Sequence, residues 1–509
     1  MKTPASPGGI GRPQYPVAVL RAAVSRLELA VSAALALTVV SFTLGSSSVS
    51  ELTQLGLRLR WLCLFALVPL SLLLLRGRSR PITVPARAIY VTAGALVLFA
   101  LDSAFWSVRP TLTLGRATSL LILVFVAASL GLAAAGRPAL AGTLVRGLVA
   151  GAAFVAASGV VLLLVDRQLA IQHSSPGTPA RFRGLGQNPN TASLLSAVVL
   201  PLAVWQLLEA RTTRARVLFG VMVVVLYGTI VGSGSYGALG ASFVGVLVLV
   251  AALDWPRQRR AALAAVALAG FVGGIGFDRA PGLTPPLPVA APVVTTPGGT
   301  TQTQTGPTTT LPGGGKRGSK GKPTKSHPKP KPPPVLPTPA PAYPGSSRLE
   351  DEIGSPSSGP GVTRRTLFGG SGRGLAWQGA LDIGLRRPLA GYGFGTEERV
   401  FVDRWYFFNG SRPENSVLGI FLQLGIVGVV LLTALAVGIV LAALRAIRQS
   451  RGSSRRLAAG CAGAVAAASL LALVQSFIYS VGNIGSVPLW VLLFLVAALS
   501  APIVAGNDA

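Results

Sequence analysis

Residues 417–444 read VLGIFLQLGIVGVVLLTALAVGIVLAAL and contain no charged side chain. A helix of about 20 apolar residues crosses the hydrocarbon core of a bilayer. No water is available there to hydrogen-bond the backbone, so a spanning segment must satisfy its own peptide groups as a helix. The stretch is therefore predicted to be a transmembrane helix.

Similar apolar runs recur along the whole chain of 509 residues, which is 50% hydrophobic and only 12% charged. Soluble proteins carry about 25% charged residues, so this composition indicates a membrane protein. We predict an all-α polytopic membrane protein with about twelve transmembrane helices. The predicted spans are 29–45, 59–75, 88–106, 117–135, 140–165, 192–208, 217–232, 238–253, 261–277, 417–444, 457–479 and 487–504.

The basic residues predict the orientation of these spans. With a cytoplasmic N-terminus, the cytoplasmic segments hold about three times as many lysines and arginines as the short outer segments, as the positive-inside rule requires. The protein is thus expected in the plasma (inner) membrane with both termini in the cytoplasm. Because the net charge of +29 is spread over short loops, we predict membrane lipids and no nucleic acid as partners.

The longest loop separates the ninth and tenth spans and is predicted to be extracytoplasmic. Its first part is rich in Thr, Pro and Lys and is predicted to be disordered; it is either a spacer or a tolerated insertion. Its second part is rich in aromatic residues and is predicted to be ordered, with a short helix over 375–389. The resulting segments are a cytoplasmic tail (1–28), spans one to nine (29–277), the linker (278–347), the ordered outer segment (348–414), spans ten to twelve (415–504) and a C-terminal tail (505–509).

Metal and disulfide chemistry are not expected. The chain has two cysteines, Cys63 and Cys461, both inside apolar runs, and two histidines, His173 and His327. Such a set supports neither a disulfide framework nor a multi-histidine metal site. We predict no metal and no cofactor.

Two polar motifs stand out in the outer segments. The first is Arg181-Phe-Arg183-Gly-Leu-Gly-Gln-Asn188-Pro-Asn190, directly before the sixth span. The second comprises Arg373 with Trp377, a glycine-rich turn over 388–395, and Glu414-Asn415 at the start of the tenth span. The aromatic cluster that contains Trp405 lies between the turn and Glu414.

These motifs resemble the O-antigen ligase and Wzy polymerase family of membrane glycosyltransferases. The resemblance rests on the order of the motifs, on the Gln423-Leu-Gly-Ile-Val-Gly428 sequence after Asn415, and on the long outer loop between the ninth and tenth spans. Glu414 stands where the family usually has histidine. Ser235-Tyr236-Gly237 stands where the family often has Ser-Arg-Gly.

The resemblance implies transfer of a glycan from a polyprenyl diphosphate carrier to an acceptor hydroxyl outside the membrane. Arginine binds phosphate oxygens through paired donors, and a carboxylate is able to take the hydroxyl proton. The predicted catalytic residues are Arg183, Arg373 and Glu414. The predicted substrate-binding residues are Arg181, Asn188, Asn190, Trp377, Asn415 and Trp405.

The sequence is also compatible with other roles for these residues. The arginines are also suited to contact lipid phosphate, Glu414 to cap a helix, and the two asparagines to shape a turn. The acceptor, a glycan or a lipid, is not identified, so a ligase and a polymerase are both compatible with the sequence. The alternative functions are a transporter or flippase of lipid-linked glycans, and a non-enzymatic scaffold that spans the cell wall.

Overall fold

The computed structural model describes residues 17–76, 83–172, 180–278, 373–402 and 412–501. The chain divides into two units: Met1–Thr284 with Thr363–Ala509, and Pro285–Val362. The second unit and most of the predicted linker lie outside the described residues, as do residues 1–16 of the predicted N-terminal tail and the whole predicted C-terminal tail (505–509). Of the predicted ordered outer segment, residues 348–372 and 403–411 also lie outside.

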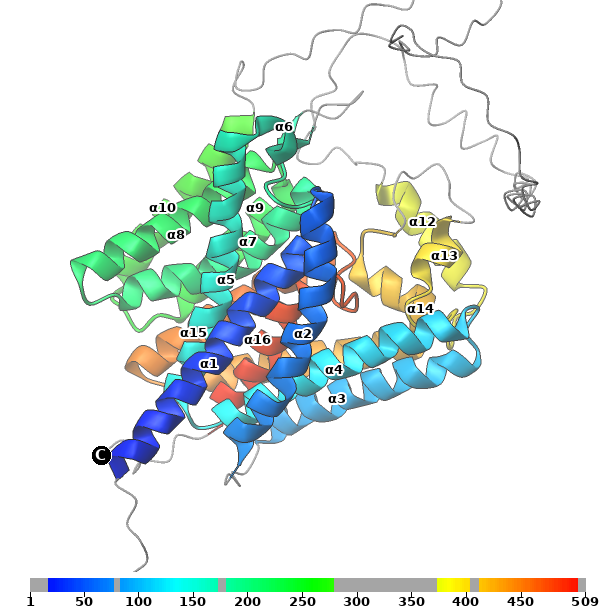
Figure 1. The fold of residues 1–509 in the computed structure, drawn as a ribbon, viewed down its shortest axis with the longest axis horizontal. Helices are drawn as coiled ribbons and strands as arrows, with labels where there is room; N and C mark the ends of the chain where they lie inside the picture. The colour runs from blue at the N-terminus through cyan, green and yellow to red at the C-terminus, as the bar shows by residue number, and fades with distance from the viewer. Residues whose placement is uncertain (1–16, 77–82, 173–179, 279–372, 403–411, 502–509) are drawn as a thin grey trace, which may run out of the picture. The chain divides into compact units, whose positions relative to one another are not determined.

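The described residues form an α-helical membrane protein, as predicted. Ten helices are long and apolar enough to cross a bilayer, and two shorter apolar helices, α9 and α16, complete the set. Figure 1 shows the helices packed side by side. Their bounds are α1 (Val17–Leu44), α2 (Ser50–Leu75), α3 (Val84–Asp102), α4 (Pro110–Ala134), α5 (Pro138–Val165), α7 (Pro189–Glu209), α8 (Thr213–Gly232), α9 (Tyr236–Ala252), α10 (Arg257–Asp278), α14 (Ser416–Gln449), α15 (Gly452–Ala472) and α16 (Ser486–Leu499).

Short elements join the long helices. The connection between α5 and α7 contains α6 (Arg167–Ala170) and an antiparallel pair of β1 (Ile171–Gln172) with β2 (Arg181–Phe182). A 3-10 turn, η1 (Ser103–Phe105), follows α3. Before α14 come α12 (Arg373–Gly384) and α13 (Glu397–Val402). Helix α12 overlaps the predicted short helix over 375–389, but it begins at Arg373 and ends at Gly384.

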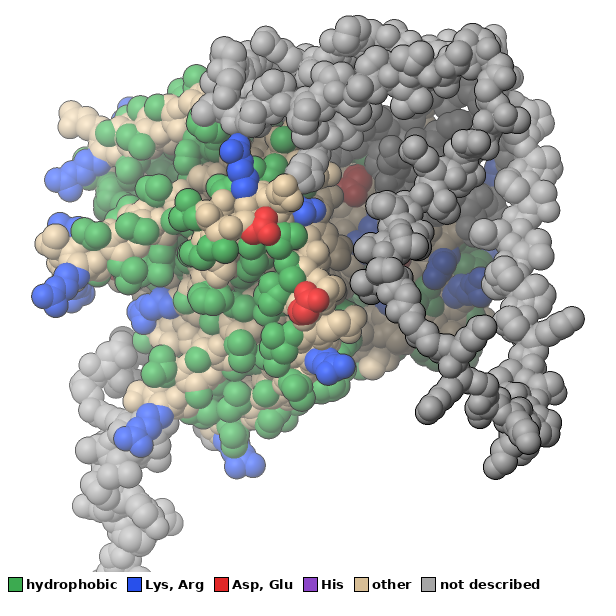
Figure 2. Space-filling model, turned by 45° about the horizontal axis from the view of Figure 1, so that its top comes forward, with side chains coloured by type: hydrophobic (Ala, Val, Ile, Leu, Met, Phe, Trp, Pro, Cys, Tyr) green, Lys and Arg blue, Asp and Glu red, His purple; other side chains and the backbone are tan. Residues whose placement is uncertain are grey.

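Connections between the helices meet at two ends of the bundle. At one end, Arg137 pairs with Glu28 and Arg456 pairs with Glu209. At the other end, Ser47 bridges Gly186, and the backbone nitrogen of Asn415 donates to Ser476. We call this second end the site face; its described connections are 45–49, 103–109, 180–188, 233–235, 385–397 and 473–485. Hydrophobic side chains cover much of the visible described surface between the ends (Figure 2), as a lipid environment requires.

Small residues bring the helices into close contact. A Cβ atom on Gly245 of α9 would lie 2.7 Å from the carbonyl oxygen of Gly463 in α15. Close backbone approach through glycine and alanine is typical of membrane helices, which gain little from hydrophobic burial against each other. Helix α16 is buried along its entire length. The Ala and Gly content of the spans therefore reflects close helix packing.

Helix α15 is shorter than the predicted span 457–479. It ends at Ala472, and Tyr479 lies in the loop that leads to α16. Ser416, at the start of α14, donates its hydroxyl to the carbonyl of Gln475 at 2.7 Å and accepts the N–H of Phe477 at 3.1 Å. Because α14 supplies these partners, the loop backbone stays satisfied without continuing the helix.

Helix α14 is interrupted at Gly425, whose φ of 62° and ψ of −158° are not helical. The turn over residues 388–395 is inserted against this break. Tyr392 and Gly393 donate their N–H groups to the carbonyls of Leu422 and Gln423, both at 2.9 Å, and Ile426 donates to Pro388 at 2.7 Å. The backbone groups freed by the break are therefore paired with the turn, which we call the insertion turn.

Glycine is required where the insertion turn meets the break. Gly391 has a φ of 66°, and a Cβ atom there would lie 2.4 Å from the carbonyl carbon of Gln423. A Cβ on Gly425 would lie 2.3 Å from the carbonyl oxygen of Leu389. Two of the sequence motifs, the glycine-rich turn and Gln423–Gly428, are thus two halves of one hydrogen-bonded structure.

Gly425→Ala should lower the stability of the folded protein. The positive φ and the clash with Leu389 together should cost about 2 kcal/mol or more. Thermal unfolding in detergent measures the effect. Gly240→Ala in α9 is the control, because its Cβ meets open space and alanine favours a helix by about 1 kcal/mol. Equal melting temperatures for the two variants would contradict this account of the break.

Candidate functional site

A cavity of about 230 Å³ lies on the site face beside the insertion turn. It combines charged and aromatic side chains from α1, α2 and α4 with residues of the insertion turn, α13 and the loop before α16. The lining residues are Phe42, Arg60, Trp61, Arg116, Ser119, Phe394, Gly395, Glu397, Arg412, Tyr479, Ser480, Val481 and Gly482.

The insertion turn leads into two carboxylates: Glu397 lines the cavity, and Glu398 pairs with the lining residues Arg116 and Arg412. Thr396 donates its hydroxyl to the carbonyl of Gly393 at 2.6 Å, and α13 begins directly afterwards with Glu397 and Glu398. Phe394 anchors the turn to the bundle, because its N–H donates to Ser103 at 2.9 Å and its carbonyl accepts from Thr113 at 2.8 Å. The turn that leads into the carboxylates is thus held by contacts to η1, α4 and α14.

Glu397 is a buried acid, with 2% of its surface exposed. Its Oε2 atom accepts hydrogen bonds from the hydroxyl of Tyr479 and from the side-chain amide of Gln423, the latter at 3.3 Å. Its Oε1 atom lies 3.4 Å from the Nε of Arg412. Burial raises the pKa of Glu397 from 4.5 to about 7, although Arg412 and the Tyr479 hydrogen bond oppose the shift.

Glu398 has the opposite electrostatic setting. Burial opposes its ionisation, but hydrogen bonds and charge from Arg116 and Arg412 lower the pKa of Glu398 below 4.5. Arg116 contacts Glu398 Oε2 at 2.8 Å, and Arg412 Nε contacts Glu398 Oε1 at 3.0 Å. Two adjacent carboxylates therefore differ in charge near neutral pH, a pattern found in acid–base sites.

Tyr479 serves as a fixed donor. Burial and the charge of Glu397 raise the pKa of Tyr479 well above 10, so its hydroxyl stays protonated. A Cβ atom on Gly419 of α14 would lie 1.7 Å from the Tyr479 oxygen and 2.5 Å from Glu397 Oε2. Because Gly419 has no side chain, there is space beside α14 for the hydrogen-bonded Tyr479 and Glu397 side chains.

Arg60 of α2 gives the cavity a further cation. Its guanidinium lies over the ring of Trp61, 5.7 Å from the centroid. Its Nε is buried and has no hydrogen-bond partner among the described residues. With Arg60, Arg116 and Arg412 against Glu397 and Glu398, the described charges favour binding of an anion.

The first sequence motif forms a different part of the site face. Arg181 is 6% exposed; its Nε donates to the carbonyl of Ser233, and its Nη2 donates to Asn190 Oδ1 at 2.7 Å. Asn188 is the N-cap of α7 and accepts the N–H of Asn190 at 2.8 Å. These contacts shape the turn, in agreement with the structural alternative for the two asparagines.

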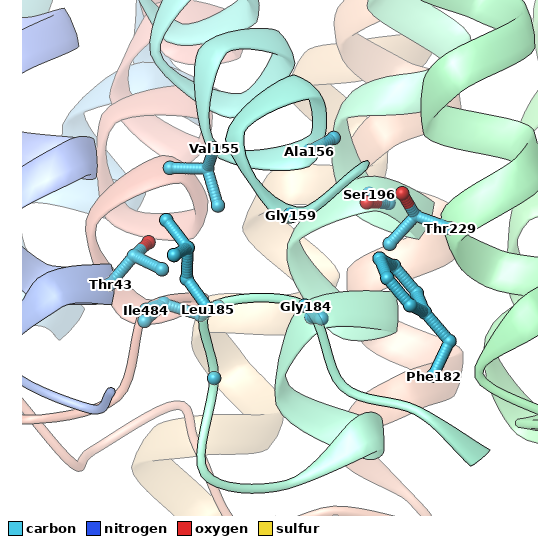
Figure 3. Close-up of a pocket in the computed structure, with 12 residues that line it drawn as sticks. Thr43, Val155, Ala156, Gly159, Phe182, Gly184, Leu185, Ser196, Thr229 and Ile484 are labelled. Carbon is cyan, nitrogen blue, oxygen red and sulfur yellow. The ribbon is translucent and has the colours of Figure 1, made fainter. Parts of the chain in front are cut away.

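Arg183 belongs to the same turn. Its Nε donates to the carbonyl of Leu169 at 2.9 Å. Beyond it, Gly184 lies against Gly159 of α5, where a small apolar cavity of about 10 Å³ remains (Figure 3). Phe182 and Leu185 point toward this cavity, which offers no charged lining residue among those that surround it. The turn is thus packed onto α5.

The remaining predicted residues lie near the insertion turn or beyond the described residues. Arg373 begins α12, a helix that lies apart from α6 in Figure 1, and its side chain is outside the described atoms. Trp377 lies in α12 with a buried indole nitrogen that has no partner among described residues. Trp405 lies outside the described residues. The predicted roles of Arg183, Arg373 and Trp405 stay predictions.

Asn415, and not Glu414, caps α14. Its side chain accepts the N–H groups of Val417 and Leu418 at 2.9 and 3.0 Å. Glu414 precedes the cap with a positive φ of 52°. The N-cap role that was the alternative for Glu414 thus belongs to Asn415.

The charged residues of the cavity lie outside the motifs from which site residues were predicted. Glu397 and Glu398 carried a usable signal, since a pair of acids follows the glycine-rich turn in a chain with only 16 acidic residues. Arg60 lies within the predicted span 59–75, and a charged residue inside a membrane span often has a function. Tyr479 carried no such signal, because it is one aromatic residue in a predicted helix.

No protein-family model and no curated protein matches this chain.

Removal of Arg181 should destabilise the protein more than removal of Arg183. Arg181→Ala leaves the carbonyl of Ser233 and the amide of Asn190 without a buried donor, which should cost about 2 kcal/mol. Arg183→Ala removes one bond on a half-buried side chain and should cost less than about 1 kcal/mol. Thermal unfolding of both variants checks the order; a reversed order would contradict the structural role of Arg181.

Proposed function

We propose that this protein is a membrane glycosyltransferase that moves a polyprenyl diphosphate-linked glycan onto an acceptor hydroxyl. The supporting observation is the cavity in which the buried Glu397, with a pKa of about 7, lies beside Arg412 and in the same lining as Arg60. A base that ionises near neutral pH and cations suited to a diphosphate are the two requirements of this reaction.

In the proposed reaction, the acceptor oxygen forms a bond to the anomeric carbon of the donor sugar. The bond from that carbon to the diphosphate oxygen breaks, and the lipid diphosphate leaves with the electron pair. Glu397 takes the hydroxyl proton on Oε1, because Oε2 already accepts from Tyr479 and Gln423. Arg60 and Arg412 stabilise the negative charge that develops on the leaving diphosphate.

This proposal changes the leading candidates within the proposed family. Glu397 replaces Glu414 as the preferred base, and Arg60 and Arg412 are preferred over Arg183 and Arg373 as diphosphate ligands. The partners are the lipid-linked glycan, an acceptor glycan or lipid, and membrane lipids. We place the site face on the extracytoplasmic side of the plasma membrane, because the opposite end carries the arginine-rich loops expected in the cytoplasm.

The rate of transfer should depend on the ionisation of Glu397. The active form is the carboxylate, so kcat/KM should fall about tenfold for each pH unit below the pKa of about 7 and level off above it. Release of lipid diphosphate by the purified protein measures the rate. Glu397→Gln should abolish this pH dependence together with at least about 99% of the activity.

Arg60 should contribute to donor binding and turnover. Arg60→Gln removes one of the arginines that line the cavity and should lower kcat/KM for the donor by roughly 10- to 100-fold. The matched control is Arg58→Gln, which removes an exposed arginine from the same helix. Arg183→Gln tests the alternative ligand. If Arg183→Gln abolishes transfer while Arg60→Gln leaves it unchanged, the diphosphate binds at the turn that contains Arg183 and not at the cavity.

A transporter of lipid-linked glycans is the second candidate. The break of α14 next to the cavity favours it, because interrupted membrane helices often line the substrate sites of transporters. Movement of a labelled lipid-linked glycan across proteoliposomes, without release of lipid diphosphate, would support transport over transfer.

A further inference from the structure

We propose that Gln423 is a positioning residue: its side-chain amide links the break of α14 to Glu397 and sets the carboxylate in its reactive orientation. This inference rests on the proposed function of the cavity. It assigns a chemical role to a residue that contacts the acid and does not line the cavity.

The amide of Gln423 is fully buried and held at both ends. Its Oε1 accepts the backbone N–H of Gly395 at 2.6 Å. Its Nε2 donates to the carbonyl of Gly419 at 3.0 Å and to Glu397 Oε2 at 3.3 Å. Because the oxygen is committed to a backbone donor, the NH2 group must face the carboxylate.

The same residue also belongs to the break. Its backbone carbonyl accepts the N–H of Gly393 at 2.9 Å, and Gly425 follows two positions later. Gln423 therefore contacts the insertion turn through both its backbone and its side chain. A shift of the turn along α14 would move Gly395, the amide and the carboxylate together.

The consequence for Glu397 is an assignment of its two oxygens. Gln423 and Tyr479 both donate to Oε2, so Oε1 is the atom left for Arg412 and for a proton from the substrate. The other charged groups around the cavity are Glu398 on α13, Arg116 on α4 and Arg60 on α2. Gln423 of α14 is a neutral donor to Glu397, and its hydrogen bond favours the charged form of Glu397.

The test uses two substitutions at Gln423 and one matched control. Gln423→Glu keeps the shape but places a second carboxyl beside Glu397, and should move the acid limb of the kcat/KM profile upward by about one pH unit or more. Gln423→Leu removes the donor; the limb should move upward by less, with kcat about tenfold lower. Thr113→Val removes the bond from Thr113 to the carbonyl of Phe394 in the same turn without contact to Glu397, so it should leave the limb unchanged.

A second readout does not depend on turnover. Infrared difference spectroscopy follows the carboxyl stretch of Glu397 against pH, with Glu397→Gln as the reference that identifies the band. The same upward shift is expected for Gln423→Glu. If wild-type protein transfers no glycan, the proposed function fails, while this titration still decides the role of Gln423.

Identical titration of Glu397 in wild type, Gln423→Glu and Thr113→Val would overturn the positioning role, whatever the stability of the variants. A lower melting temperature of Gln423→Leu with an unshifted profile would assign the residue to folding alone. A shift in Gln423→Glu that is absent in Thr113→Val supports the proposal.

Discussion

A helix broken within a membrane protein must find partners for the peptide groups that the break releases, and this requirement shapes the site face. In α14 the partners come from the insertion turn, whose N–H groups reach the carbonyls of Leu422 and Gln423. An unpaired peptide group in an apolar interior costs several kcal/mol. The break and the turn are therefore interdependent, and the position of the turn determines where α13 and its two acids begin.

The electrostatics of the cavity follow from this placement. Glu398 forms ion pairs with Arg116 and Arg412, and these two positive charges keep it ionised. Glu397 lies deeper and receives mainly neutral donors, so burial dominates and raises its pKa to about 7. Replacing both acids by apolar residues would relieve a desolvation penalty. The desolvation penalty is therefore consistent with a functional role for the difference in pKa between Glu397 and Glu398.

The structure adds contacts that the sequence motifs by themselves do not show. The Arg181 to Asn190 motif, for which the resemblance implies catalytic and substrate-binding roles, forms a turn whose buried arginine bonds Ser233 and Asn190, and those roles stay predictions. The glycine-rich turn and the Gln423–Gly428 sequence, which the resemblance noted separately, contact each other at the break. The charged residues of the proposed site lie beside this second pair, at positions that no single motif marks.

The sequence by itself determined the helices, because a bilayer requires long apolar segments and those are visible residue by residue. It also predicted the glycine-rich turn over 388–395, because glycine and proline mark turns. Only the tertiary structure decided that α15 ends at Ala472, because the loop that follows it pairs with α14: the hydroxyl of Ser416 donates to the carbonyl of Gln475 and accepts the N–H of Phe477. It alone decided that Arg60, Glu397 and Tyr479 share one cavity, because three segments far apart in the chain meet only when the helices pack.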